Sequence, residues 1–188
     1  MSFIPRLSLR LWFLAPLLAF GFILWIHSMR VQRVELVSGS LTTSLSTDAE
    51  SPTGYAGGQR LLIAPGHNNE SYQWIAQTQR MVADGEWRLR KVDYDNAPTG
   101  RAVLTPSPYR WWLATVGWFN QFKSGRPIGQ AIERGALWAD PILHLFFVGG
   151  GVVFTWWRFG RLPAVLFSLG VAALFPFAGG FVPGAPDA

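Results

Sequence analysis

Two carboxylates, Asp93 and Asp95, form the pair of side chains in this sequence with the clearest chemical potential. They lie two residues apart, so an extended segment would place both on one face. Paired carboxylates can hold a hard divalent cation such as Mg²⁺ or Mn²⁺. The pair therefore gives a candidate metal site, although D-x-D is a short and common pattern.

Arginine side chains around these carboxylates offer a second chemistry. The guanidinium groups of Arg88, Arg90 and Arg101 can bind phosphate through paired N–H donors. A structural salt-bridge network of the two acids with Arg88 and Arg90 explains the same residues equally well. Both interpretations stay open from spacing alone.

A further carboxylate, Glu70, stands at the start of a predicted helix. Asn68 or Asn69 can cap that helix. Helical spacing continues through Tyr72, Ile75, Ala76, Gln79 and Val82 as far as Gly85, which is typical of the residue after a helix end. An acid in the first turn is favoured by the helix dipole. By spacing alone we therefore prefer a capping role for Glu70 over a catalytic one.

Three apolar runs frame this polar region. Residues 11–26 carry no charge, and with the preceding turn they reach about 30 Å, enough to cross a bilayer. A retained anchor is favoured over a signal peptide, because the run is long and no small-x-small cleavage site follows it. Residues 141–157 and 162–182 predict a helical hairpin, in which Gly149–Gly151 allow close helix packing.

The basic residues predict how these spans are oriented. Arg6 and Arg10 precede the first run, and Arg158 and Arg161 lie in the hairpin turn, with no acid at either place. The positive-inside rule makes both places cytoplasmic, so residues 27–140 lie outside. All eleven acids fall on the predicted outer side. This partition argues against nucleic acid as a partner despite the net charge of +5.

Within the outer loop, partial alternation of apolar and polar residues predicts a strand or extended segment over residues 31–45. The aromatic run Tyr109–Phe119 predicts a helix at the membrane interface, which we prefer to a sugar-stacking platform. His144 is expected to be an interfacial histidine hydrogen-bonded to backbone or water rather than a site residue.

Composition agrees with a membrane protein. Charged residues make up 14% of the 188 residues, against about 25% in average soluble domains, and 49% are hydrophobic. The absence of cysteine excludes a disulfide framework, a thiolate zinc site and a cysteine nucleophile. No G-x-S-x-G, Walker or H-E-x-x-H motif supports a hydrolase or a nucleotide enzyme of those kinds.

The predicted fold is an α-helical membrane protein with three transmembrane helices and a long, partly helical outer loop. Its predicted parts are an N-terminal anchor (1–30), an extracytoplasmic loop (31–140), a transmembrane hairpin (141–183) and the start of a second outer loop (184–188), which we expect to be truncated.

This layout resembles the N-terminal part of a GT-C membrane glycosyltransferase, in particular the bacterial inner-membrane relatives of the oligosaccharyltransferase catalytic subunit. In that group the first outer loop opens with an acidic motif and continues through a G-x-W, an N-x-P-x-G and a Pro-containing element. The matching residues here are Asn69–Ser71, Gly85–Trp87, Asn96–Gly100 and Thr105–Pro108.

Two departures from the family pattern stand out. Asn69 replaces the first acid of the opening motif, and Asp187 is not followed by the two histidines that relatives carry. Since GT-C enzymes normally have eight or more spans, the resemblance implies that this chain is their N-terminal third, either as a truncated product or as a degenerate remnant. It also implies that the chain lacks turnover on its own.

The resemblance implies transfer of a sugar from a polyprenyl-phosphate carrier to a glycan or protein acceptor, at the outer face of a bacterial inner (plasma) membrane. Such a site needs a carboxylate as base or metal ligand and a cation for the departing phosphate. The implied catalytic residues are Glu70 and Asp187, the phosphate-binding residues Arg88, Arg90 and Arg101, and the metal ligands Asp93 and Asp95.

Another class of function competes with this one. A non-catalytic three-span membrane protein could use the outer loop to bind a partner or to scaffold an assembly. A truncated transporter is disfavoured, because the spans hold few polar residues or helix breaks at mid-membrane.

Overall fold

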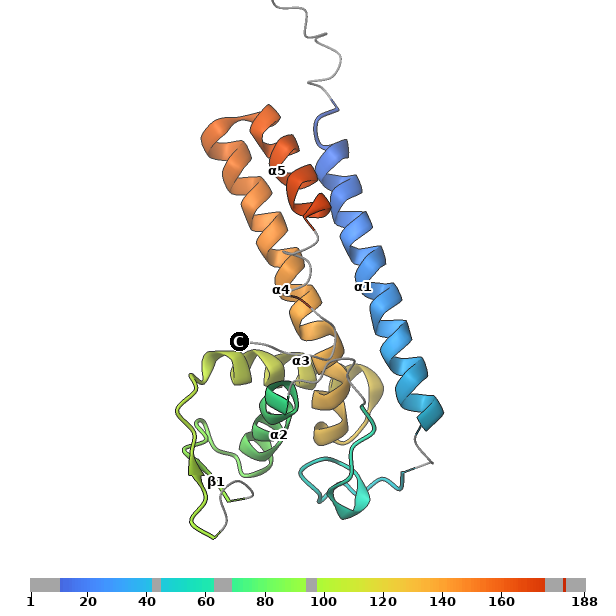
Figure 1. Ribbon diagram of the computed structural model, residues 1–188, viewed down its shortest axis with the longest axis vertical. Helices are drawn as coiled ribbons and strands as arrows, with labels where there is room; N and C mark the ends of the chain where they lie inside the picture. Colours follow the sequence, from blue (N-terminus) through green and yellow to red (C-terminus); the bar gives the residue numbers. More distant parts are fainter. Residues whose placement is uncertain (1–10, 42–44, 63–68, 94–97, 175–180, 182–188) are drawn as a thin grey trace, which may run out of the picture. The chain divides into compact units, whose positions relative to one another are not determined.

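The computed structural model of the chain describes residues 11–41, 45–62, 69–93, 98–174 and 181 (Figure 1). The described chain is mostly helical and divides into two compact units. The first unit comprises residues 1–30 and 141–182, and the second unit comprises residues 31–140 and 183–188. Arg6, Arg10, Asp95 and Asp187 lie outside the described residues.

The first helix, α1 (Leu14–Leu41), is continuous, so the strand or extended segment predicted for residues 31–45 is wrong over the helical part. Val31, Val34 and Ser38 are buried. Their spacing is that of one face of an α-helix, and burial of this stripe outweighs the short alternation around Glu35.

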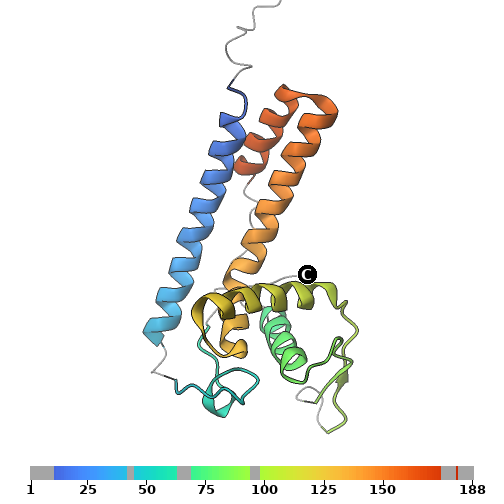
Figure 2. The same cartoon turned by 180° about the vertical axis from the view of Figure 1, so that it is seen from behind.

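Three helical segments pack together in the first unit: the start of α1, the end of α4 (Ile128–Phe159) and α5 (Arg161–Ala173). Ile23, Val148 and Val171, one from each helix, form a buried cluster. Figure 2 shows α4 and α5 running side by side from a short turn at Gly160.

Close packing of α4 on α5 depends on one glycine. A Cβ atom at Gly151 would lie 2.5 Å from the ring of Phe167. Gly149 and Gly150 have open space around them. The predicted role of the small residues in the hairpin is thus confirmed at Gly151.

Two helical segments are long and apolar enough to cross a membrane, Leu14–Gly39 and Ile128–Phe159. The 32 residues of α4 extend about 48 Å, well beyond the roughly 30 Å hydrocarbon core of a bilayer. The third apolar helix, α5, has 13 residues and ends where Leu174 turns to an extended conformation. The remainder of the predicted third span lies largely outside the described residues.

The second unit contains α2 (Asn69–Ala83), the short strands β1 (Lys91–Val92) and β2 (Arg101–Ala102), the 3₁₀ turn η1 (Ala56–Gly58) and α3 (Pro108–Ser124), together with the ends of α1 and α4 that belong to it. Ile75, Leu113 and Ile132 are fully buried in its core. α3 lies against α4 at Gly117, where a Cβ would come within 2.5 Å of Ile132.

The helix predicted before Gly85 is confirmed as α2. Gly85 has a φ of 68°, in the left-handed region, and the Glu86 N–H donates to the Met81 carbonyl at 2.9 Å. This is the pattern in which a glycine ends a helix and satisfies its last carbonyls. The end of α2 directs the chain into the strand pair that carries the basic residues.

Candidate functional site

The basic residues near Asp93 lie on and around a two-stranded hairpin. β1 pairs antiparallel with β2, with Val92 opposite Arg101, and the Val103 N–H donates to the Arg90 carbonyl at 2.9 Å. Gly100 closes the turn with a φ of 68°, and a Cβ there would meet the Val92 carbonyl at 2.6 Å. The hairpin therefore needs a glycine at this position.

Leu89, Val92 and Val103 form a small buried cluster within the hairpin. Arg88, Arg90 and Arg101, which lie on or next to the same two strands, are exposed. The structure thus brings all three predicted phosphate-binding arginines to the surface of one hairpin.

The predicted carboxylates are only partly accounted for. Asp93 is exposed just after β1, and Glu70 lies in the first turn of α2, where the structure describes the backbone but not the side chain. In the described ranges, no ion pair joins Asp93 to Arg88 or Arg90, so the alternative of a salt-bridge network has no support there.

No group of three or more His, Cys, Asp or Glu side chains that could hold a metal ion is present among the described residues. Whether Asp93 and Asp95 lie together is not described, because Asp95 is outside the described residues.

A cavity of about 120 Å³ lies between α2 and the hairpin. Gln73 and Gln77 line it from α2, and Arg101 lines it from β2. Glu70 precedes Gln73 by three residues and Gln77 by seven, so all three positions belong to one face of the helix. The backbone of Glu70 therefore lies one helical turn before Gln73, on the face of α2 that lines the cavity together with Arg101.

A buried arginine, Arg110, supports this cavity, and the sequence reasoning missed it. Its Nε and Nη2 atoms donate to Gln77 Oε1 at 3.0 and 2.7 Å, and its Nη1 donates to the Thr105 carbonyl at 3.2 Å. The guanidinium also lies over the Trp74 ring, 4.8 Å from its centroid. Arg110 therefore fixes two residues of the cavity wall, Gln77 and Thr105.

The predicted aromatic helix is confirmed as a helix, α3, whose two faces differ. Trp111 donates through Nε1 to the Trp87 carbonyl at 2.9 Å, and the two rings lie 4.7 Å apart. Trp118, Phe119 and Phe122 are exposed by 53, 71 and 90%. α3 thus presents an uncovered aromatic surface within the second unit, and its location at a membrane interface stays a prediction.

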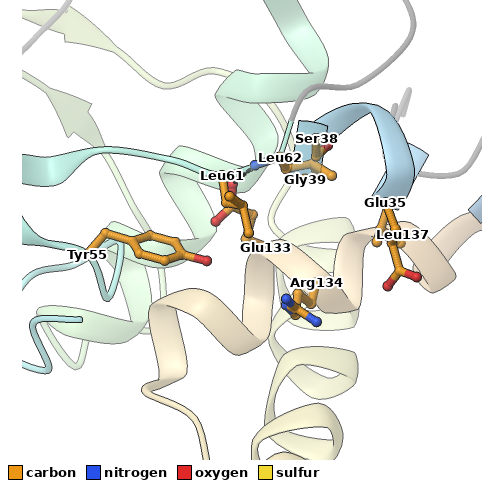
Figure 3. Close-up of a pocket in the computed structure, with 9 residues that line it drawn as sticks. All are labelled: Glu35, Ser38, Gly39, Tyr55, Leu61, Leu62, Glu133, Arg134 and Leu137. Atoms are coloured by element: carbon orange, nitrogen blue, oxygen red, sulfur yellow. Dashed lines mark hydrogen bonds between the residues drawn. The ribbon is translucent and has the colours of Figure 1, made fainter. Parts of the chain in front are cut away.

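A larger cavity of about 250 Å³ lies elsewhere in the second unit (Figure 3). Glu133 of α4 lines it together with Tyr55 and Arg134, none of which the sequence reasoning selected. The Glu133 carboxylate is almost fully buried and accepts a hydrogen bond from the Leu62 N–H at 2.6 Å. A single acid in a helix gives no sequence signal of such burial.

His144 differs from the expectation of an interfacial histidine bonded to backbone or water. It is buried in the first unit, and its Nδ1 lies 2.9 Å from Nε2 of His27 in a hydrogen bond. Phe181 stacks on the same ring with a centroid distance of 4.6 Å. The partner is a side chain 117 positions away, which no local pattern could indicate.

Comparison of the chain with protein-family models, with curated proteins and with solved structures finds no match. Function is therefore argued below from the motifs and from the geometry of the second unit.

Proposed function

We propose that this chain corresponds to the N-terminal portion of a GT-C-type membrane glycosyltransferase in a bacterial inner membrane. In this proposal α1, α4 and the apolar segment beginning with α5 cross the bilayer, and the second unit lies on the outer face. The donor is a sugar on a polyprenyl phosphate, and the acceptor is a glycan or a protein.

The observation that carries this proposal is that α2 and the basic hairpin line the same cavity. Arg101 lines it from the hairpin, opposite the face of α2 on which Glu70 stands one turn before Gln73. Departure of the phosphate requires a cation and activation of the acceptor requires a carboxylate, and in this proposal Arg101 and Glu70 supply them. Arg88 and Arg90 extend the exposed basic surface beside it.

In the proposed reaction the arginines stabilise the leaving phosphate and Glu70 accepts a proton. The bond between the sugar's anomeric carbon and the phosphate oxygen breaks, and the bonding electrons leave with the phosphate, whose charge the arginines stabilise. The acceptor hydroxyl forms the new bond to that carbon and gives its proton to the Glu70 carboxylate. Asp187 stays a second proposed carboxylate, and Mg²⁺ or Mn²⁺ a proposed cofactor.

The phosphate part of this proposal is tested by ligand binding. The protein is placed in nanodiscs and titrated with a polyprenyl phosphate and with the polyprenol of the same chain length. We expect the phosphate to bind more tightly and Arg101→Gln to weaken it about tenfold, which is the scale of one hydrogen bond to a charged group.

Lys123→Gln is the matched control, since Lys123 is an exposed cation at the far end of α3. It should leave both affinities unchanged. Equal binding of the phosphate and the alcohol, or equal losses in the two variants, would rule out a phosphate site at Arg101.

The exposed aromatic surface of α3 favours a second candidate, a non-catalytic membrane protein whose outer loop binds a partner or scaffolds an assembly. Trp118, Phe119 and Phe122 are large, uncovered side chains of the kind enriched in protein interfaces. This candidate predicts that the lipid phosphate makes no difference in the titration above.

A further inference from the structure

The 250 Å³ cavity beside Glu133 has the features of a built binding site. By volume it has room for about eight water-sized groups, since one water occupies about 30 Å³ of liquid. Its walls come from the end of α1, from the chain segment that includes Leu62 and from α4, all within the second unit. Three separate segments therefore converge on one space.

One oxygen at this cavity lacks a partner. Glu133 is only 2% exposed, and while its Oε1 accepts the Leu62 N–H, its Oε2 has no hydrogen-bond partner within the described part of the chain. A buried carboxylate oxygen left without a donor is destabilising, because it has lost its hydrogen bonds to water without replacement. The Glu133 carboxylate thus keeps one acceptor oxygen that no donor in the described part of the chain satisfies.

The remaining polar groups fix the character of that ligand. Figure 3 shows Tyr55 extending its hydroxyl toward Glu133, with Glu35 of α1 at the other end of the lining, near Leu137. Two carboxylates and one guanidinium, that of Arg134, line the cavity, so its lining carries a formal charge of −1. Arg60 acts electrostatically on Glu133 from outside the lining. Leu62 and Leu137 complete the wall with apolar surface.

We propose that this cavity binds a small organic ammonium ion, with the N–H donors on the Glu133 carboxylate and the alkyl part against Leu62 and Leu137. An ammonium group brings three donors and no acceptor, which suits a lining rich in oxygen acceptors. Its hydrogen bond to a carboxylate is charge-assisted and about twice as strong as a neutral one. The proposal is independent of the glycosyltransferase assignment.

The test uses three probes that share a butyl chain and differ in the polar head group: butylammonium, 1-butanol and butyltrimethylammonium. Calorimetric titration of the full chain in nanodiscs should show butylammonium binding about tenfold or more tightly than either other probe. 1-Butanol lacks the charge, and butyltrimethylammonium lacks the N–H donors. Equal binding of the three probes, or preference for the alcohol, would overturn the proposal.

Glu133→Gln should weaken butylammonium binding about tenfold to a hundredfold, as expected for a lost charge-assisted hydrogen bond. Glu86→Gln, at an exposed carboxylate outside the cavity, is the control and should bind as the parent does. Glu35→Gln serves as a second variant if Glu133→Gln does not fold, because Glu35 is exposed. If Glu133→Gln and Glu35→Gln, wherever they fold, bind butylammonium as tightly as the parent chain, the ammonium site is contradicted.

Two sources supply such a group, a free amine and the headgroup of an aminophospholipid. Nanodiscs of phosphatidylcholine alone are therefore compared with nanodiscs containing phosphatidylethanolamine. Weaker butylammonium binding in the second kind identifies the lipid headgroup as occupant. Equal binding identifies a free amine, and either result supports the ammonium site.

Discussion

Nε2 of His27 and Nδ1 of His144 lie 2.9 Å apart, and both rings are buried in the first unit. One of the two nitrogens donates the hydrogen bond, which joins α1 to α4 across 117 positions of sequence. The rings meet edge to face with their centroids 5.1 Å apart. This hydrogen bond links α1 and α4, which also pack through the apolar side chains of Ile23 and Val148.

Removing either histidine should destabilise this unit. His27→Leu or His144→Leu removes this hydrogen bond from the other imidazole, at a cost of about 1–3 kcal/mol. The double variant should lose less free energy of unfolding than the sum of the two single variants, because it leaves neither imidazole with an unsatisfied nitrogen from this pair. Unfolding of the purified protein in detergent measures the three values, and strict additivity would show that the pair contributes no coupling.

Arg110 provides a second prediction, in the second unit. Arg110→Lys keeps the charge but loses the fork that donates twice to Gln77 Oε1. We expect a loss of about 2 kcal/mol in the free energy of unfolding. Arg90→Lys, at an exposed arginine, should change it by less than about 0.5 kcal/mol. Similar values for the two variants would mean that Arg110 does not hold α2 to α3.

Two helical glycines of the second unit form a matched pair. A Cβ at Gly129 would lie 2.3 Å from the Pro52 carbonyl oxygen, whereas one at Gly39 meets nothing within 4 Å. Gly129→Ala should therefore lower stability by about 1–3 kcal/mol, the usual range for overpacking. Gly39→Ala should raise it by up to about 1 kcal/mol, since alanine favours helix. Thermal unfolding distinguishes the two, and a tolerated Gly129→Ala would contradict the close packing of α4 on residues 52–54.

Tyr55 gives a prediction for alkaline pH. Burial raises the pKa of its phenol above the ordinary value near 10, and the Glu133 charge raises it further. The folded protein then keeps this proton at pH values where the unfolded chain loses it. The stabilisation is fully present below about pH 10 and is lost as the pH rises through the folded pKa.

Ultraviolet absorbance of the phenolate measures this shift, with Tyr55→Phe identifying the residue responsible. Stability of Tyr55→Phe should depend less on pH above about 10 than that of the parent chain. Identical profiles would show that Tyr55 titrates as an ordinary exposed tyrosine.

Local patterns predicted the parts of the fold that depend on neighbouring residues. The end of α2 at Gly85, the helix over the aromatic run and the close approach at Gly151 all follow from short-range rules on glycine and helical spacing. The extension of α1 beyond residue 30 was missed, because a few alternating residues look like a strand until the buried stripe is known.

The candidate sites could be predicted only in part, for a different reason. The basic residues of the hairpin are adjacent in sequence, so their clustering was visible. Arg110, Glu133 and His27 acquire their partners 33, 71 and 117 positions away, through contacts that only the folded chain provides. A buried charge and an exposed one look the same in a single sequence.

In the proposed topology, the second unit lies on the outer side of the membrane and the turn between α4 and α5 lies on the cytoplasmic side. The chain contains no cysteine, so each introduced thiol is unique. Lys123→Cys and Phe159→Cys, both at exposed positions, are treated in intact cells with a membrane-impermeant maleimide. We predict labelling of Lys123→Cys at once and of Phe159→Cys only after permeabilisation. Labelling of both in intact cells, or of Phe159→Cys alone, would contradict the account.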